Sequence, residues 1–153
     1  MSKAIVKTIS SQATVREDAE VIEVEDCSNL LRLDVSHNKV HTLRVHRSRY
    51  IVTLDISHNC LTAFDCSQLT FLRNLDISHN QLEELDVFAA TVLRALDCSS
   101  NQLKRLELPP LENLNVRDNP LEECKCQAVG EFKFDGNQVD ATNGVRAHVH
   151  VIY

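Results

Sequence analysis

A short block of alternating apolar and polar residues recurs along most of the chain. In the copy that begins at Leu75, apolar Leu75 and Ile77 alternate with polar Asp76 and Ser78, and an asparagine follows two residues later. A period of two predicts a strand that buries one row of side chains and exposes the other. Successive copies lie 21, 21, 21, 18 and 18 residues apart, and each contains one asparagine: Asn38, Asn59, Asn80, Asn101, Asn119 and Asn137.

A fixed period of this length is typical of stacked structural units. One short strand cannot bury its apolar row alone, but neighbours stacked at each repeat can, and a short return connection places them in a parallel sheet. Where each strand ends, the chain turns inward and leaves backbone N–H and C=O groups without partners. An asparagine amide donates and accepts, so a stack of asparagines can satisfy those groups. Glycine is absent before Gly130, and we therefore expect asparagine to take any left-handed turn conformation as well.

The second half of each repeat predicts a further short strand on the outer side of the coil. In the copy Leu82-Glu83-Glu84-Leu85-Asp86-Val87, apolar residues again alternate with charged ones. About five residues then remain before the next inner strand, too few for a stable α-helix. We therefore expect extended or one-turn 3₁₀ structure there.

The blocks LDVSHNKV, LDISHNCL, LDISHNQL, LDCSSNQL and LNVRDNPL give the pattern L-x-x-L-x-h-x-x-N-x-L, where h is apolar. This pattern resembles the leucine-rich repeat family, in its short intracellular form, over residues 19–139. The resemblance implies a right-handed β-solenoid with a parallel sheet on its concave face and little or no α-helix. It implies one domain: a cap and half repeat in residues 1–29, six repeats in 30–139 that start at 30, 51, 72, 93, 111 and 129, and a capping strand in 140–153. Residues 1–18 match the repeat poorly, and whether they form strand or helix stays open.

Composition narrows the choice of partners. The 153 residues contain 16 Lys+Arg and 22 Asp+Glu, a net charge of −6, which argues against nucleic acid or an anionic membrane as the main partner. No apolar run has membrane-spanning length and the start lacks a signal-peptide core, so we expect a cytoplasmic protein. Cys66 and Cys98 occupy apolar positions of the repeat, and we expect all six cysteines to be reduced.

Equivalent positions of stacked repeats form rows, and the rows suggest where a partner binds. Aspartates form one row on the concave sheet, serines the next, and histidines a third at the sheet's edge. An aspartate row favours a basic or extended partner segment. The predicted partner-binding residues are Arg32, Asp34, His37, Asp55, His58, Asp76, His79, Asp97 and Arg117.

Catalysis and metal binding are the weaker interpretations of these rows. Asp, Ser and His recur in unit after unit, whereas a catalytic triad is a single constellation beside an oxyanion hole. Imidazoles about 4.8 Å apart converge on zinc only if they lean together, and without that we expect exposed rings packed edge to edge. Protonation of this row near its ordinary pKa could still modulate a contact. We predict no catalytic residue, no metal and no cofactor.

A basic patch on the first repeat is the second candidate site. It lies on the rim and convex side, where a phosphate or an acidic tail could bind, although a solvated charged face is commoner. Its residues are Lys39, Arg44, Arg47 and Arg49.

The sequence therefore predicts a non-catalytic module that binds another protein on its concave face. The alternative is a regulatory or targeting domain of a larger signalling enzyme, or of a cytoskeletal or ciliary assembly. The segment Leu106-Glu107-Leu108-Pro109-Pro110-Leu111 resembles those of leucine-rich phosphatases. The last apolar strand leaves an open sheet edge, which indicates either a cut from a longer protein or self-association there.

Overall fold

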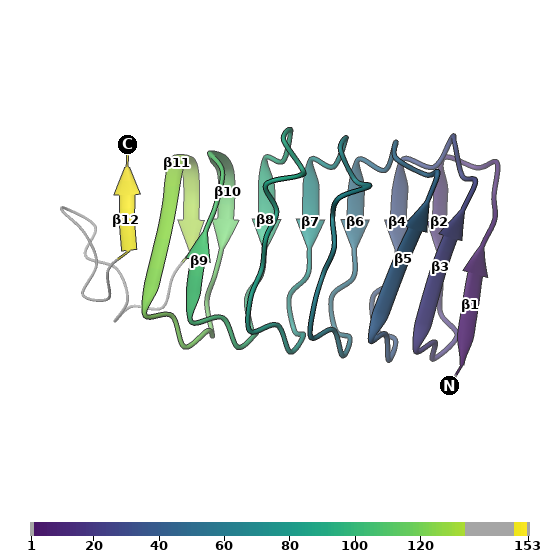
Figure 1. The fold of residues 1–153 in the computed structure, drawn as a ribbon, viewed down its shortest axis with the longest axis horizontal. Helices are drawn as coiled ribbons and strands as arrows, with labels where there is room; N and C mark the ends of the chain where they lie inside the picture. Colours follow the sequence, from purple (N-terminus) through teal and green to yellow (C-terminus); the bar gives the residue numbers. More distant parts are fainter. Residues whose placement is uncertain (1, 134–148, 153) are drawn as a thin grey trace.

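The computed structural model is a coil of parallel β-strands arranged in two rows (Figure 1). It describes residues 2–133 and 149–152, and the side chains of residues 2–125. The strands of the outer row are drawn in front and point up, and those of the inner row lie behind and point down (Figure 1). The outer strands are β1 (Lys3–Val6), β3 (Val21–Glu25), β5 (Thr42–His46), β9 (Arg105–Glu107) and β12 (Val149–Ile152). The inner strands are β2 (Gln12–Thr14), β4 (Arg32–Asp34), β6 (Thr53–Asp55), β7 (Asn74–Asp76), β8 (Ala95–Asp97) and β10 (Leu111–Asn115).

The remaining strand, β11 (Glu123–Lys133), belongs to both rows. Its first residues pair with β9 and β12 on the outer side, and its last residues pair with β10 on the inner side. Every pairing is parallel, and no helix is present in the residues that the structure describes. The predicted fold, a β-solenoid with an inner parallel sheet, is confirmed.

The inner strands are three to five residues long, and β4, β6, β7 and β8 are each centred on one buried leucine. Leu54 pairs with Leu33 on one side and Leu75 on the other, and each of the three is at most 2 % exposed. The residues on either side of the leucine face solvent on the inner sheet. The core fills the space between the two rows, and Cys66 and Cys98 are buried in it, as predicted.

Stacked asparagine side chains support the turn that follows each inner strand. The Nδ2 of Asn80 donates to the carbonyls of Ile77 (3.0 Å), Ser78 (3.1 Å) and Ile56 (3.1 Å), and its Oδ1 accepts from the N–H of Leu61 (3.0 Å). The predicted asparagine stack is thus confirmed at five positions, namely Asn38, Asn59, Asn80, Asn101 and Asn119. Asn137 lies outside the described residues.

The prediction that asparagine takes the left-handed conformation was wrong. The residue before the asparagine does so instead: φ is 55° at His37, 53° at His58 and 52° at His79, and Ser100 and Asp118 follow the same rule. The asparagine must point its amide into the core to reach the backbone. The preceding residue therefore turns the chain, and its own side chain faces outward.

Residues 2–18 contain two strands, β1 and β2, and no helix, which answers the question that the sequence left open. β1 pairs with β3 in the outer row, and β2 pairs with β4 in the inner row, with Ala13 opposite Leu33 and Thr14 opposite Asp34. These residues add a coil before the first recognisable repeat. The periodic pattern missed it because Ala13 stands where the later repeats have leucine, and residues 1–18 contain no asparagine.

In the described residues, outer-row strands pair with one another only near the two ends of the coil. β1, β3 and β5 form one sheet, β9, β11 and β12 form another, and extended chain and turns lie between them. This agrees with the predicted extended outer side.

At the C-terminal end, β12 is the last strand in the sheet order. The proposed self-association through its edge stays a prediction, and residues 134–148 of the predicted last repeat and cap lie outside the described part.

Candidate functional site

The inner sheet presents a row of four aspartates at the ends of β4, β6, β7 and β8. The strand register places Asp34, Asp55, Asp76 and Asp97 side by side. Each Oδ1 accepts two hydrogen bonds from the serine two residues later, one from its N–H (3.0 Å) and one from its hydroxyl (2.6–2.7 Å). The four serines are consequently buried, so the serine row does not offer its hydroxyls to a partner.

The second carboxylate oxygen distinguishes the middle of the row from its ends. Arg16 donates to the Oδ2 of Asp34 at 2.8 Å, and Asn115 donates to the Oδ2 of Asp97 at 2.8 Å. Within residues 2–125, the Oδ2 atoms of Asp55 and Asp76 have no hydrogen bond or ion pair. The two central carboxylates are therefore the ones open to a partner.

Burial raises the pKa of the Asp76 carboxyl, and the neighbouring charges of Asp97 and Asp55 raise it further, against the hydrogen bonds from Ser78, which lower it. The folded chain thus binds a proton at Asp76 more readily than the unfolded chain does. The free energy of unfolding therefore falls as the pH rises through the raised pKa of Asp76. The cost of burying the charged carboxylate disappears fully only below the pKa of this group in the unfolded chain, about 3.9.

We expect Asp76→Asn to make the domain more stable than the wild type at pH 7, because the amide oxygen still accepts from Ser78 and the unfavourable charge is gone. The advantage should shrink as the pH falls towards about 3, where the wild-type carboxyl is mostly protonated in both the folded and the unfolded chain. Urea unfolding at a series of pH values measures both effects.

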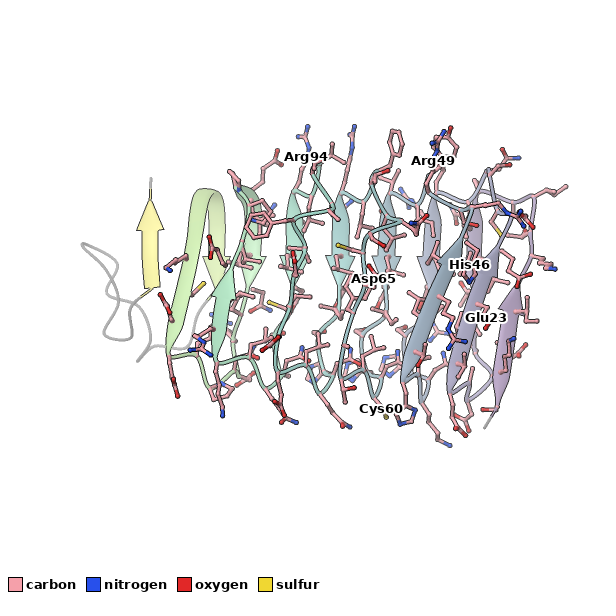
Figure 2. The ribbon with its side chains drawn as sticks, viewed as in Figure 1. Glu23, His46, Arg49, Cys60, Asp65 and Arg94 are labelled. Atoms are coloured by element: carbon pink, nitrogen blue, oxygen red, sulfur yellow. The ribbon has the colours of Figure 1, made fainter. Side chains whose placement is uncertain are left out.

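Asp65 on the outer side provides a control, because its pKa is shifted in the opposite direction to that of Asp76 (Figure 2). Hydrogen bonds from the Ser67 backbone and side chain lower the pKa of the Asp65 carboxyl. This carboxylate stabilises the fold above the unfolded pKa, and its contribution is lost as the pH falls through the lowered one. Asp65→Asn should therefore be less stable than the wild type at pH 7. Equal pH profiles for the two variants would contradict this account of Asp76.

A shallow hollow of roughly 430 Å³ lies over the middle of the inner sheet. Three rows line it: the aspartate row with Asn115, the row two residues earlier, which is uncharged here, and the central leucines of the strands between them. The second row consists of Thr53, Asn74, Ala95 and Asn113. An open hollow with a carboxylate floor and short, uncharged side chains beside it suits a chain segment better than an enclosed small molecule.

The histidine row lies at the turns that follow β4, β6 and β7. The rings stack face to face rather than edge to edge as predicted: centroids are 4.3 Å apart for His37 and His58 and 4.1 Å for His58 and His79, with ring planes within 11°. The identical left-handed backbone at the three positions aims the rings in the same direction. Desolvation and the two neighbouring imidazoles lower the pKa of His58. Among the residues that the structure describes, no group of three or more His, Cys, Asp or Glu side chains could hold a metal ion.

The two arginines predicted for this face lie one strand in from its two ends. Arg32 is the first residue of β4, and Arg117 follows β10. Both are exposed.

The predicted second patch does not present four free cations. Lys39 pairs with Asp18 (3.2 Å), Arg44 with Glu23 (3.0 Å) and Arg47 with Asp26 (2.6 Å), each an acidic residue of the preceding coil. The guanidinium of Arg49 lies 5.1 Å from the centre of the Tyr50 ring. Whether this patch binds a phosphate or an acidic tail stays a prediction.

Sequence reasoning missed a row of exposed apolar side chains on the turns that lead into β6, β7 and β8. Tyr50, Phe71 and Val92 lie 21 residues apart and are 38, 46 and 40 % exposed. The signal was present, because each directly precedes the buried residue that opens a repeat.

The parallel coil, the buried leucine of each inner strand and the asparagine stack together define the leucine-rich repeat class. Family models agree: one described as "Leucine Rich Repeat" matches residues 71–89, and one described as "Leucine Rich repeat" matches residues 26–42 and 47–63. The chain is a leucine-rich repeat protein. Such repeats generally mediate protein–protein interaction and are generally non-catalytic.

A solved structure with this fold is described as the functional domain of InlJ from Listeria monocytogenes, which includes a cysteine ladder. It is similar over 84 % of this chain, with 23 % sequence identity and a TM-score of 0.60, and the chain spans 36 % of that structure's length. A search of curated proteins found no match. In the described residues, no helix has the length and apolar character needed to span a membrane.

Proposed function

We propose that this chain is a protein-interaction module whose concave inner sheet binds an extended, basic segment of a partner protein. The observation that supports this most directly is the pair of open carboxylate oxygens on Asp55 and Asp76 in the middle of the hollow. Adjacent carboxylates repel each other, and the structure around them supplies no compensating cation, so a cation from a partner relieves that repulsion.

The other predicted residues of this face contribute less in this proposal. Asp34 and Asp97 already have partners for their second oxygen atoms, so a ligand must compete with Arg16 or Asn115. Arg32, Arg117 and the histidine row border the site and stay predicted contacts, as does the alternative of a regulatory or targeting domain in a larger protein.

The test begins with a randomised peptide library selected on the immobilised wild-type domain, which should enrich peptides rich in Lys and Arg. We expect the double variant Asp55→Asn/Asp76→Asn to bind a selected basic peptide about tenfold more weakly, because two charge pairs of about 0.5–1 kcal/mol each are lost. Asparagine keeps the oxygen that accepts from Ser57 and Ser78, so the turn geometry is retained. Fluorescence anisotropy of the labelled peptide measures the dissociation constant.

The outer side offers a matched control in Asp65→Asn/Asp86→Asn. These two aspartates also accept a hydrogen bond from the N–H two residues later, so the variant makes the same charge change in the same kind of turn on the opposite face. It should bind the basic peptide as the wild type does. Equal weakening by both double variants would mean that only the net charge matters, and the concave site would be ruled out.

A further inference from the structure

A ridge of exposed apolar side chains lies along the edge where the chain passes from the outer row to the inner row. We call it the rim ridge, and it consists of Tyr50, Phe71 and Val92, which lie 21 residues apart and are 38–46 % exposed. The Tyr50 and Phe71 rings are in contact, with centroids 5.2 Å apart. Figure 2 shows Arg49 and Arg94, neighbours of this ridge in sequence, at the same upper edge of the molecule.

The core does not need these side chains. The next residue in each repeat, Ile51, Leu72 or Leu93, already fills the core and is at most 5 % exposed. The equivalent positions at either end of the ridge are Asn29 and Pro110, so the exposed apolar row is confined to the middle of the coil. Adjacent exposed apolar side chains bounded by charged ones are typical of a surface that binds another protein.

The ridge is positively charged although the chain as a whole has a net charge of −6. Arg49 stacks on Tyr50 and donates to its hydroxyl at 3.1 Å, and Arg94 pairs with Glu112 at 2.7 Å. The side chain of Arg73, which directly follows buried Leu72, is exposed and has no ion pair or hydrogen bond within residues 2–125. Arginines beside aromatic rings favour a ligand that combines apolar groups with carboxylates.

We propose that the rim ridge is a second binding site, separate from the concave face, for a short extended segment of a partner protein that carries apolar and acidic side chains. The repeats from Tyr50 to Val92 span about 10 Å along the coil, which an extended chain covers in about three residues. The apolar side chains of the segment pack on Tyr50 and Phe71, and its carboxylates pair with Arg73 and Arg49. The aspartate row of the concave face disfavours the same segment there, so the two surfaces select opposite charges.

The same peptide selection on the wild-type domain tests this site. It should yield a second class of peptides, rich in Phe, Leu or Val together with Asp and Glu. We expect Phe71→Ser and Arg73→Glu each to weaken binding of such a peptide by about tenfold, as the loss of a central contact does. Asp55→Asn/Asp76→Asn should not weaken it.

Two outer-side variants serve as controls. Ile5→Ser removes a half-exposed apolar side chain from β1, and Arg105→Glu reverses an exposed arginine on β9. Both should change the affinity less than about twofold if the site is the ridge.

Three results would overturn the proposal: selection yields no acidic, apolar class; Phe71→Ser and Arg73→Glu leave the affinity of that class unchanged; or the outer-side variants weaken it equally. Sedimentation velocity tests the remaining possibility, which is that the ridge binds a second copy of this chain. A dimer that dissociates in Phe71→Ser would show that the ridge contacts a second copy of this chain. Failure of the basic peptides alone would count against the concave site and leave the ridge standing.

Discussion

Asn80→Ala is expected to lower the free energy of unfolding by about 3–5 kcal/mol, a large part of the 5–15 kcal/mol typical of a single domain. The side chain makes four hydrogen bonds to buried or partly buried backbone, and alanine makes none. Urea unfolding followed by circular dichroism measures the loss.

The four lost bonds do not contribute equally. The carbonyls of Ile56 and Ile77 also accept from Asn59 and Asn101 in the neighbouring repeats, so they keep a donor. The N–H of Leu61 has no such alternative and is left unsatisfied in the core, at a cost of about 1–3 kcal/mol, with the remaining loss arising from the other bonds and the small cavity.

The same repeat provides a control for this substitution. Asn74 lies on the exposed face of β7 and makes a single long side-chain contact, 3.4 Å to the hydroxyl of Thr53. Asn74→Ala should change the free energy of unfolding by less than about 0.5 kcal/mol. If Asn80→Ala were as mild, the asparagine stack would not be what holds successive turns together.

The sequence was sufficient to predict the coil and the role of its asparagines. The spacing of the repeats places equivalent residues in contact, and an amide is the side chain that donates and accepts at once, so Asn59 and Asn80 could be assigned to the backbone without coordinates. The aspartate row on the inner sheet followed from the same register.

Differences between equivalent residues could not be predicted, because they depend on the parts of the chain that depart from the repeat. Arg16, in the coil that the pattern missed, pairs with Asp34, and Asn115 replaces the aspartate that would otherwise repel Asp97. These two departures leave Asp55 and Asp76 as the open pair. A consensus pattern treats all four aspartates alike.

The repeat pattern also did not predict that the histidine rings stack face to face. This stacking depends on the positive φ at His58, whereas the sequence suggested that the neighbouring asparagine had the positive φ. The exposed side chains of the rim ridge were visible as a 21-residue series, but only the structure shows that Ile51 and Leu72 fill the core without them.

His58→Val should lower the free energy of unfolding by about 1–3 kcal/mol. Its φ of 53° lies in the left-handed region, which histidine, asparagine and aspartate tolerate and a β-branched residue strongly disfavours. Valine also removes the ring that stacks on His37 and His79. Urea unfolding at pH 7.5, where the unfolded imidazole is mostly neutral, separates this effect from titration.

Two further substitutions divide the effect of His58→Val into its causes. His58→Asn keeps a residue that accepts positive φ and loses only the ring stacking, so it should cost less than about 1 kcal/mol. His46→Val places the same substitution on the exposed face of β5, where a β-branched residue suits the extended backbone, and it should be neutral or slightly stabilising. If His58→Val and His58→Asn were equally destabilising, the stacked imidazoles rather than the backbone would determine which residues the turn accepts. If all three variants were neutral, the turn would tolerate β-branched side chains, and the left-handed backbone would not explain why histidine, serine and aspartate occupy this row.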